Sequence, residues 1–237
     1  LMVIHFAEAS VSKPAPQDLV TLRQVFETID EHSCPHQFNF HMHTIHSDGQ
    51  LQPEGLVEQA ISIGLQGFAI TDHHQIAGYL AAQQWLDRWK QENLPAEKSA
   101  PHLWTGVEIT SQLLYTEVHI LGYGFDPTHI AIAAYLQGTA PAGKAAQADT
   151  VIAALHEAGG LAVLAHPVRY RRSAEDLIAA AAAAGIDGIE AYYAYNNPNP
   201  WQPSFRETEQ VKKLGQQFNL LTTCGTDTHG KNLLLRI

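Results

Sequence analysis

Histidine and carboxylate side chains gather in short segments that lie far apart in this 237-residue chain. Each segment follows an apolar run of the kind that forms a β-strand. The segments are His41-Met42-His43 with Asp48, Thr71-Asp72-His73-His74, Glu108 leading on to His119, Ala165-His166-Pro167, and Asp227-Thr228-His229. Imidazole nitrogens and carboxylate oxygens together bind manganese, iron and zinc in proteins. A multinuclear site in a metal-dependent hydrolase is therefore the leading hypothesis.

Residue spacing predicts which of these side chains point the same way. His41 and His43 are separated by one residue on an expected strand, so both lie on the same face. Asp227 and His229 have the same spacing. Taken singly, each could be a hydrogen-bonded core histidine or the carboxylate of an ordinary turn. Together at strand ends they favour a site, because a parallel α/β barrel builds its active face at the carboxyl ends of its strands.

Three further positions carry their own signals. His73 and His74 are adjacent and point in opposite directions on an extended backbone, so only His73 is expected to enter the site. Glu108 ends an apolar run, where a carboxylate is costly to bury unless it is paired or bound to metal. Its two oxygens suit it to bridge two ions. His119 lies between apolar neighbours and could equally be a core histidine.

Strands and helices alternate along the chain, which indicates βα units and a largely parallel sheet. Strands are expected at residues 38–44, 67–71, 102–110, 117–122, 161–165, 188–193 and 220–224. Helices are expected at residues 18–31, 53–63, 77–92, 127–136, 145–158, 173–184 and 204–218. About seven strands favour a barrel over an open sheet, and the third and fourth could pair through a turn near residues 114–116. Pro53 and Gly64 bound the second helix, and Ser173 is a suitable N-cap for the sixth.

Composition and charge narrow the class of protein. The formal net charge of −10 argues against an extended nucleic-acid surface. Three divalent ions would offset about six of these charges within the cleft, so a small anion could still be attracted. Cys34 and Cys224 make no disulfide framework, and we expect reduced, buried thiols. No run reaches transmembrane length and the first residues do not resemble a signal peptide, so a cytoplasmic protein without membrane contact is expected.

The ordered motifs resemble those of the PHP family, named for polymerase and histidinol phosphatase. The matching strings are His41-Met42-His43-Thr44, Ser47-Asp48-Gly49, Ile70-Thr71-Asp72-His73, Gly106-Val107-Glu108-Ile109, His119-Ile120-Leu121-Gly122, Ala165-His166-Pro167 and Gly225-Thr226-Asp227-Thr228-His229. The resemblance covers about residues 38–230 in the family's order. It implies a distorted (βα)7, TIM-like barrel at residues 37–237, after an N-terminal extension with a helix at residues 1–36.

The resemblance also implies three divalent ions, manganese, zinc or iron, and a ligand set for each. The first ion would bind His41, His43 and Asp227, the second would bind His119 and His166 and share Glu108 with the first, and the third would bind Asp48, His73 and His229. Closely spaced ions could share a hydroxide nucleophile and neutralise both the phosphate oxygens and the leaving alkoxide. Glu108, His166, Asp227 and Arg169 are the candidate catalytic residues.

Substrate contacts are less well marked in the sequence. Arg169, Arg171 and Arg172 follow His166 on an expected loop, where a guanidinium could clamp a phosphate or form an ordinary solvated turn. Arg169 and Arg171 are the candidates that we retain. Tyr193, at the end of the next strand, could form a pocket wall for a base or ring, or pack in the core.

Three departures from the family pattern stand out. Relatives often carry Asp where this chain has His74, which could alter how neighbouring ligands are oriented. Nucleotide phosphatases and 5′-to-3′ exoribonucleases of the family commonly insert a helical domain between the ligands that match His119 and His166. Only 47 positions separate them here, so no separate domain fits. Eight residues follow His229, which leaves little room for a closing helix.

These observations predict a metal-dependent phosphoesterase acting on a nucleotide, a short oligonucleotide end or a small phosphorylated metabolite. A histidinol phosphatase is the first alternative, ranked lower because the motif wording is closer to the nucleotide-directed branch. A non-catalytic, metal-stabilised binding or regulatory module is the second, although such modules lose ligands and none is missing here. An amidohydrolase-like enzyme is the third, but its usual carboxylated lysine has no candidate on a strand.

Overall fold

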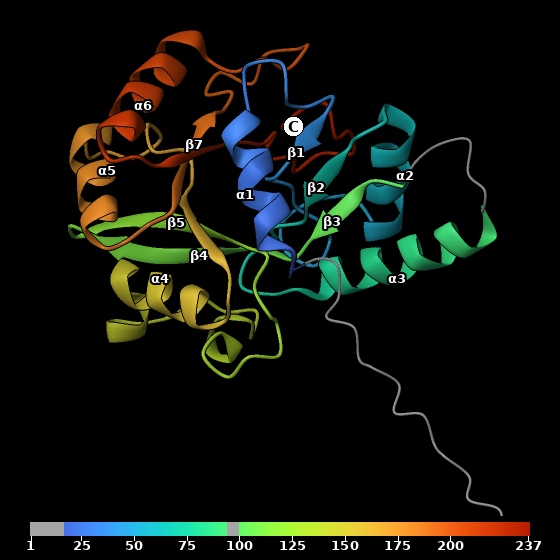
Figure 1. The fold of residues 1–237 in the computed structure, drawn as a ribbon, viewed down its shortest axis with the longest axis horizontal. Coiled ribbons are helices and arrows are strands. Elements are labelled where there is room, and N and C mark those ends of the chain that lie inside the picture. The colour runs from blue at the N-terminus through green and yellow to red at the C-terminus, as the bar shows by residue number, and fades with distance from the viewer. Residues whose placement is uncertain (1–16, 94–99) are drawn as a thin grey trace, which may run out of the picture.

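The fold is mixed α/β, as the alternation of strands and helices predicts, and a computed structural model describes residues 17–93 and 100–237 (Figure 1). In this part of the chain the α-helices are α1 (Leu19–Thr28), α2 (Pro53–Ile63), α3 (Ala77–Glu92), α4 (Ala148–Glu157), α5 (Ala174–Ala183) and α6 (Phe205–Gln217). The strands are β1 (Phe38–Asn39), β2 (Gly67–Ala69), β3 (His102–Trp104), β4 (Gly106–Leu113), β5 (Thr116–Tyr123), β6 (Leu161–Leu164), β7 (Gly188–Tyr192) and β8 (Leu221–Cys224). Residues 1–16 of the expected N-terminal extension lie outside the described ranges.

The first sheet consists of β1, β2 and β3 in parallel, with α2 and α3 beside it (Figure 1). α2 begins at Pro53 and ends before Gly64, whose φ of 87° suits a glycine C-cap, so both expected boundaries are confirmed. Leu56 of α2, Leu86 of α3 and Phe68 of β2 belong to one buried apolar cluster. This cluster anchors the segments that follow β1 and β2.

The second sheet has the order β4-β5-β6-β7-β8 and mixes the two strand directions. β4 and β5 form an antiparallel hairpin through Leu114 and Tyr115, whose φ values of 50° and 60° fit the type I′ turn of two-residue hairpins. β6, β7 and β8 are parallel, whereas β5 and β6 are antiparallel. The expected turn near residues 114–116 is confirmed. The sheet is less parallel than expected, because the hairpin reverses the direction of β5.

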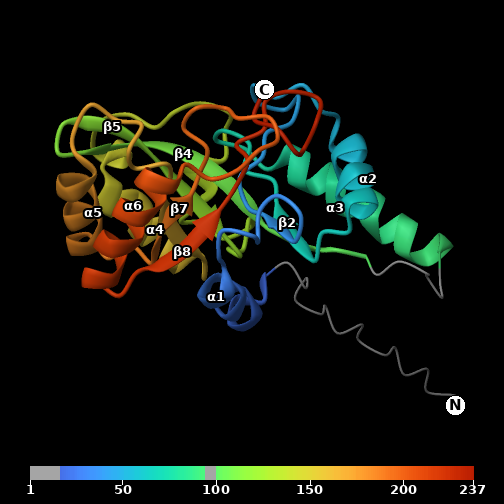
Figure 2. The ribbon, with the colours of Figure 1, turned by 90° about the horizontal axis from the view of Figure 1, so that it is seen from above.

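Backbone hydrogen bonds join the two sheets on both sides. Beyond β1, the N–H of Phe40 donates to the carbonyl of Cys224 at the end of β8 (3.0 Å). On the other side, the N–H of Glu108 in β4 donates to the carbonyl of Asp72 beyond β2 (3.2 Å). In the view of Figure 2, α4, α5 and α6 lie with the second sheet and α2 and α3 lie at the other end of the molecule. The segments that follow β1, β2 and β8 therefore meet β4.

An aromatic core ties α1 to the strands. The ring centroid of Phe26 lies 4.9 Å from that of Phe40 and 5.5 Å from that of Tyr123. The hydroxyl of Tyr123 donates to the carbonyl of Phe40 (2.7 Å), which keeps the buried phenol paired. Asp18 caps α1 by accepting a hydrogen bond from the N–H of Thr21. α1 thus packs on the main core immediately before β1.

The helix expected at residues 127–136 is wrong. The carboxylate of Asp126 accepts hydrogen bonds from both the N–H and the hydroxyl of Thr128 (2.9 and 2.7 Å), and such local bonds favour turns over helix. Only Ala133–Tyr135 form a short 3-10 helix. Ile132 and Tyr135 are buried but Ile130 is 85% exposed, so only a short part of the segment packs on the core.

The strand expected at residues 38–44 is shorter in the structure. Regular pairing ends at Asn39, after which single backbone bonds, such as that from the N–H of His43 to the carbonyl of Thr228 (3.0 Å), alternate with bonds to side chains. The N–H of Met42 donates to the hydroxyl of Thr71 (3.1 Å), and the N–H of Thr44 donates to the carboxylate of Asp72 (2.7 Å). These bonds hold the segment in place without a continuous ladder.

Two helix starts test the remaining local expectations. The helix expected at residues 145–158 begins later, at Ala148, because Gly143–Ala146 form a 3-10 turn before it. α5 begins directly after Ser173, whose hydroxyl accepts a hydrogen bond from the N–H of Asp176 (3.2 Å). The expected N-cap is confirmed.

Candidate metal centre

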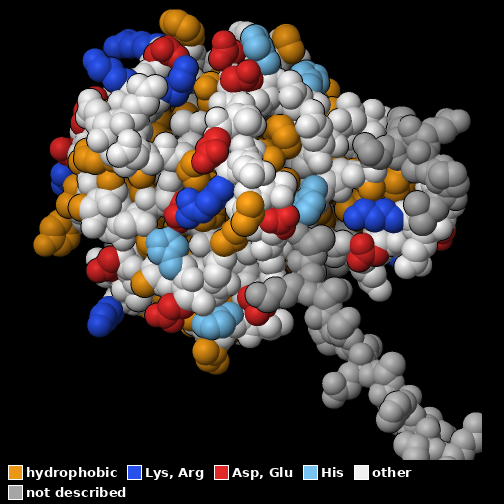
Figure 3. All heavy atoms as spheres, viewed as in Figure 1, with side chains coloured by type: hydrophobic (Ala, Val, Ile, Leu, Met, Phe, Trp, Pro, Cys, Tyr) orange, Lys and Arg blue, Asp and Glu red, His pale blue; other side chains and the backbone are white. Residues whose placement is uncertain are grey.

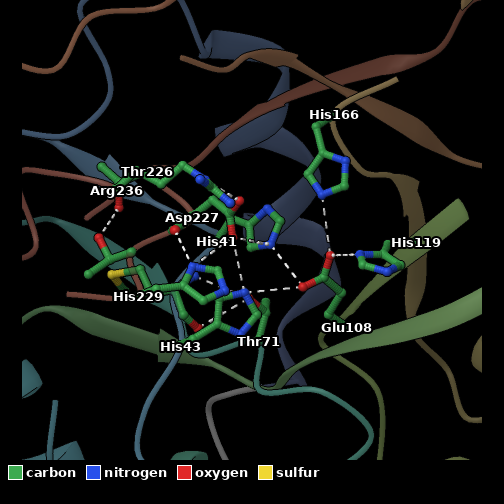
Figure 4. A network of polar contacts seen from close by, with 12 residues as sticks. His41, His43, Thr71, Glu108, His119, His166, Thr226, Asp227, His229 and Arg236 are labelled. Atoms are coloured by element: carbon green, nitrogen blue, oxygen red, sulfur yellow. Dashed lines mark hydrogen bonds and ion pairs between the residues drawn. The ribbon is translucent and has the colours of Figure 1, made fainter. Parts of the chain in front are cut away.

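Nine side chains expected as ligands come together where the segments after β1, β2, β6 and β8 meet the β4–β5 hairpin. Figure 4 labels all of them except Asp48 and His73. They fall into overlapping groups whose ligand atoms lie within 4.8 Å of one another. The groups are His41, His43, Glu108 and Asp227; His43, Asp48, His73 and His229; His73, Glu108 and His119; and His41, His166 and Glu190. The structure therefore brings together all nine expected ligands, and it adds Glu190.

Glu108 occupies the centre of the cluster and is fully buried. Its Oε2 lies 3.1 Å from Nε2 of His41 and 3.1 Å from Nε2 of His43. Its Oε1 lies 2.7 Å from Nδ1 of His119 and 3.5 Å from Nε2 of His166. Oε2 also lies 3.6 Å from Nε2 of His73, so the two oxygens face different sets of imidazoles. This arrangement suits a carboxylate that is shared between two ions.

Asp227 also divides its two oxygens between different partners. Oδ1 lies 3.2 Å from Nε2 of His43 and faces the histidine cluster. Oδ2 accepts hydrogen bonds from the hydroxyl of Tyr193 (2.7 Å), from Nη1 of Arg169 (3.2 Å) and from Nε of Arg236 (2.9 Å). Asp227 therefore connects the ligand cluster to a pair of guanidinium groups.

Asp48 is the most exposed of the expected ligands, with 52% of its side chain accessible. Its Oδ2 lies 3.1 Å from Nε2 of His229 and 3.5 Å from Nε2 of His73. The loop that carries Asp48 is tied down by the buried carboxylate of Asp72, which accepts a hydrogen bond from the hydroxyl of Ser47 (2.7 Å). This group forms the solvent-facing edge of the cluster, where a substrate could enter.

Backbone strain accompanies the site. His74, His166 and Asp227 have φ values of 55°, 29° and 53°, a region that residues other than glycine rarely adopt.

The His73-His74 doublet separates as expected. His73 joins two of the ligand groups, whereas Nε2 of His74 lies 3.1 Å from the hydroxyl of Thr110 and belongs to none of them.

Burial and charge oppose each other in the cluster. Burial disfavours the imidazolium form of His43, but the carboxylates of Asp227 and Glu108 raise its pKa to about 9. Burial also disfavours the ionised form of Glu108, yet the neighbouring imidazole of His41 holds its pKa well below the usual value. Burial lowers the pKa of His166, which keeps its ring neutral and its lone pair available. The cluster therefore attracts positive charge to its carboxylates.

The donor set fits divalent transition-metal ions. Nε2 of His43 lies near carboxylate oxygens of both Glu108 and Asp227, but in the described chain it has no partner in hydrogen-bond geometry. A buried polar atom without a partner is costly, and an ion between the nitrogen and the two carboxylates would satisfy all three groups. Mixed imidazole and carboxylate ligands suit manganese, iron and zinc alike.

The expected substrate contacts fare differently. Arg169 reaches the cluster through its hydrogen bond to Oδ2 of Asp227. Its Nη1 also donates to the hydroxyl of Tyr193 (3.2 Å). Tyr193 is buried and its hydroxyl is used by Asp227, so it supports the site rather than offering an open stacking face. Arg171 is exposed, and within the described residues no hydrogen bond or ion pair joins it to the cluster. Its place at the site rests on the sequence alone.

Two residues at the site escaped sequence reasoning. Glu190 is a fully buried carboxylate on β7, and its signal was a charge within an apolar strand, the same signal that singled out Glu108. Arg236 reaches Asp227 because the last residues fold back, with the N–H of His229 donating to the carbonyl of Arg236 (2.7 Å). No local pattern in the sequence predicts that the last residues fold back toward Asp227.

Other expectations concern the rest of the molecule. Cys34 and Cys224 are both free and buried, as expected. No helix in the described residues is long and apolar enough to cross a membrane. On the face drawn in Figure 3, basic side chains that gather at the corner near α6 lie among acidic ones, and others are scattered. That face carries no broad basic surface.

Curated relatives are bacterial nucleases. The chain is 25% identical to a 5′-3′ exoribonuclease of Haemophilus influenzae over 275 residues, covering 83% of this chain and 94% of the relative. It is 27% identical to the 5′-3′ exoribonuclease Rnm of Escherichia coli over 263 residues, covering 81% and 85%. Both alignments are longer than the 237-residue chain, so these relatives carry residues with no counterpart here.

Solved structures share the fold. A protein of Bifidobacterium adolescentis assigned as a metal-dependent phosphoesterase matches with a TM-score of 0.65 and 25% identity, over 83% of this chain and 89% of that one. An amidohydrolase of Chromobacterium violaceum, solved with bound sulfate and no metal, matches with a TM-score of 0.68 and 20% identity, over 85% and 90%. The latter likeness concerns the fold alone.

The PHP domain model matches residues 39–210, which is most of the chain. The match begins at the strand that precedes His41 and His43, and it includes Glu108, His119 and His166. Together with the order of the motifs and the convergence of their side chains, this match establishes the relationship that the sequence suggested. The chain belongs to the PHP domain family.

Proposed function

We propose that this chain is a metal-dependent phosphoesterase that hydrolyses a phosphate ester of a nucleotide, a short oligonucleotide or a small metabolite. The observation that carries the proposal is the arrangement of Glu108, which turns each oxygen toward a different set of imidazoles. Family membership and relatives that are phosphoric ester hydrolases support the same reaction class.

Three ions are part of the proposal, with the ligand sets that the family resemblance implies. Glu108 would be shared between two ions, and Asp48, His73 and His229 would hold the third at the exposed edge. When bound, the ions would supply Lewis acidity and lower the pKa of a water molecule so that it can attack phosphorus. His166, kept neutral by burial, would act as a ligand and not as a proton donor.

The chain's own cations would orient the phosphate. Arg169 and Arg236 share one oxygen of Asp227, and each guanidinium has further N–H groups. An anion that approaches the cluster could accept hydrogen bonds from both groups. Two guanidiniums beside the ligand cluster would hold phosphate oxygens in a defined orientation and offset their charge. Tyr193 keeps Asp227 in place through its short hydrogen bond.

The architecture that we propose for residues 37–237 is a distorted (βα)7 barrel. Only Thr105 separates β3 from β4, so these two can be counted as one bent strand, which leaves seven. The hydrogen bonds from Phe40 to Cys224 and from Glu108 to Asp72 support closure on both sides. α1 would then cover the barrel from the N-terminal extension.

We propose nucleotides or RNA ends as the substrates of this chain, and the names of its relatives support this choice. Both curated relatives above are 5′-3′ exoribonucleases. The relatives' additional residues have no counterpart here, so we propose a smaller contact with the substrate and a shorter preferred length. A phosphorylated mononucleotide or dinucleotide would be a better substrate than a long RNA.

A hydrolysis screen tests this function. Purified protein would be assayed with an aryl phosphate, nucleotides, histidinol phosphate and 5′-phosphorylated RNA of several lengths, each with manganese, zinc or iron. We expect metal-stimulated phosphate release, abolished by a chelator. His166→Ala should lose this activity, whereas His156→Ala, at a histidine with 40% of its side chain exposed, should keep it.

Three outcomes would contradict the proposal. Fewer than two ions per chain by elemental analysis would exclude a multinuclear site. A His166→Ala variant as active as the wild type would show that hydrolysis occurs elsewhere. Tight metal binding without turnover of any phosphate ester would favour a non-catalytic binding module.

A further inference from the structure

Glu190 lies on β7 with its side chain fully buried, and both of its oxygens have partners. Oε1 lies 2.9 Å from Nδ1 of His41. Oε2 accepts a hydrogen bond from the backbone N–H of His166 (2.8 Å). One carboxylate therefore contacts two of the expected ligands, which come from segments on different strands. Glu190 belongs to none of the three ligand sets that the family resemblance implies.

We propose that Glu190 is a positioning residue that holds His41 and His166 in the orientation required for metal binding. The inference rests on the proposed metal centre and deepens it. Nε2 of His41 faces Glu108 and Asp227, at 3.1 and 3.4 Å, whereas Nδ1 faces Glu190. A carboxylate at Nδ1 holds the proton there, so that the lone pair of Nε2 points into the cluster.

The second contact acts on the backbone. His166 has a φ of 29°, a strained value for a residue with a side chain. Its Nδ1 is buried without a partner in the described chain, and its Nε2 is 3.5 Å from Glu108. Neighbouring rings such as those of Tyr170 and Tyr193 pack against it, but no hydrogen bond to Nδ1 fixes its direction. The bond from its N–H to Glu190 holds the strained turn, and the turn aims the ring.

Direct metal ligation by Glu190 fits these contacts less well. His41, His166 and Glu190 do form a group of adjacent ligand atoms. Each oxygen of Glu190, however, already accepts a hydrogen bond or faces a ring nitrogen at hydrogen-bond distance, and one of the donors is a backbone N–H that cannot turn away. An ion at this place would compete with that buried N–H for the same oxygen, and loss of the bond would be costly.

Substitution by glutamine tests the positioning effect, because it preserves the size and replaces one acceptor with a donor, while Glu190→Asp keeps the charge that glutamine removes. If the amide oxygen of Glu190→Gln keeps the N–H of His166, the amide NH2 faces Nδ1 of His41. The histidine proton must then move to Nε2, where it blocks the metal. If the amide is flipped, its NH2 faces the N–H of His166, and two donors then face each other. Either orientation misplaces one ligand.

Asp187 supplies a matched control at the other end of the same strands. Its Oδ2 lies 2.7 Å from Nε2 of His156 and accepts a hydrogen bond from the N–H of Ala162 in β6 (2.9 Å). The chemistry matches that of Glu190, with one carboxylate joining one imidazole and one backbone N–H. Asp187 belongs to none of the ligand groups found in the described residues.

The experiment measures zinc binding by calorimetry and the unfolding midpoint with and without zinc, for the wild type, Glu190→Gln, Glu190→Asp and Asp187→Asn. We expect Glu190→Gln to weaken zinc binding by about 10- to 100-fold and to reduce the metal-induced rise of the midpoint. Glu190→Asp keeps the charge but cannot span both partners, so its loss should be smaller. Asp187→Asn should lower both midpoints equally and leave zinc affinity unchanged.

Three results would overturn the inference. Zinc affinity of Glu190→Gln within about threefold of the wild type would reduce Glu190 to a packing role. Equal midpoint losses with and without zinc would do the same. A wild type that binds no zinc would remove the metal centre altogether. A wild type that binds zinc without hydrolysing phosphate esters would instead refute only the proposed function, since none of these readouts uses turnover.

Discussion

Asp187 directly precedes β7 and Glu190 lies at its centre, and the two make the same kinds of contact in different surroundings. Each contacts one histidine and accepts one backbone hydrogen bond from the β6 segment. Asp187 has 12% of its side chain exposed and also pairs with Arg23. Glu190 and His41 are fully buried, and the carboxylates of Glu108 and Asp227 also lie close to His41. Only burial and neighbours distinguish the pairs.

A carboxylate that contacts one imidazole and one backbone N–H can therefore have two different effects, depending on its surroundings. Water can solvate the ion pair at the Asp187 end, so its charges are screened and the contact mainly joins elements. At the Glu190 end, desolvated carboxylates face imidazoles that cannot all be charged, and cations offer a way to satisfy them. The same contacts therefore contribute to stability at one end and prepare a binding site at the other.

The largest expected effect comes from the buried end. Glu108→Gln removes the carboxylate whose two oxygens face different sets of imidazoles, so at least one ion should be lost. Metal-stimulated hydrolysis of an aryl phosphate should fall by about a thousandfold, in line with losing a group that stabilises transition-state charge. Hydrolysis rates and elemental analysis measure the two effects. Glu117→Gln, exposed on β5 of the same hairpin, is the control and should change neither.

The next effect concerns the exposed end. Asp187→Asn weakens the contacts with His156, Ala162 and Arg23, and hydrogen bonds to charged groups contribute about 1.5–3 kcal/mol each at most. We expect the free energy of unfolding to fall by about 2 kcal/mol in urea titrations. Hydrolysis should stay within about twofold of the wild type. A rate loss larger than the stability loss would erase the distinction between the two ends.

Metal affinity should depend on pH at the buried end. The carboxylates around His43 raise its pKa to about 9, so the metal-free ring is mostly protonated at pH 7. An ion binds only the neutral ring, and binding must therefore release that proton. The manganese association constant should rise between pH 7 and 9, by about tenfold per pH unit for each proton released, and level off above that. An affinity that is flat or falls over this range in calorimetric titrations would be inconsistent with the assigned protonation.

The smallest effect is expected at Arg23. Its guanidinium lies 2.7 Å from Asp187 but has 48% of its side chain exposed. Exposed ion pairs contribute about 0.2–1 kcal/mol, so Arg23→Ala should lower the free energy of unfolding by less than about 1 kcal/mol. Urea titrations in low and high salt would check this value. A larger loss would show that the exposed pair is less screened than its accessibility indicates.

The sequence was most informative where a ligand follows a strand. His41 and His43 could be placed together because side-chain alternation on a strand is regular. The helix at residues 127–136 failed because the bonds of Asp126 to Thr128 are a local choice that composition does not reveal. Arg236 lay beyond prediction, since its position depends on how the last residues fold back.

Glu190 is a different kind of omission. A carboxylate inside the apolar run from Gly188 to Tyr193 carries the same physical signal as Glu108, because burying either charge requires partners. The family motifs drew attention to one and not to the other. Treating every charge in an apolar strand alike would have found both.

The β4–β5 turn has an evolutionary consequence. Thr110 pairs with His119, so Glu108 lies two residues along β4 on the same face of the hairpin as His119. Tyr115 at the tip is fully exposed, and selection has little reason to preserve the identity of its side chain. The length of the turn is another matter, because one added residue that shifts the register would turn His119 to the opposite face. Lineages of this protein should therefore tolerate substitutions at the tip and reject single-residue insertions there.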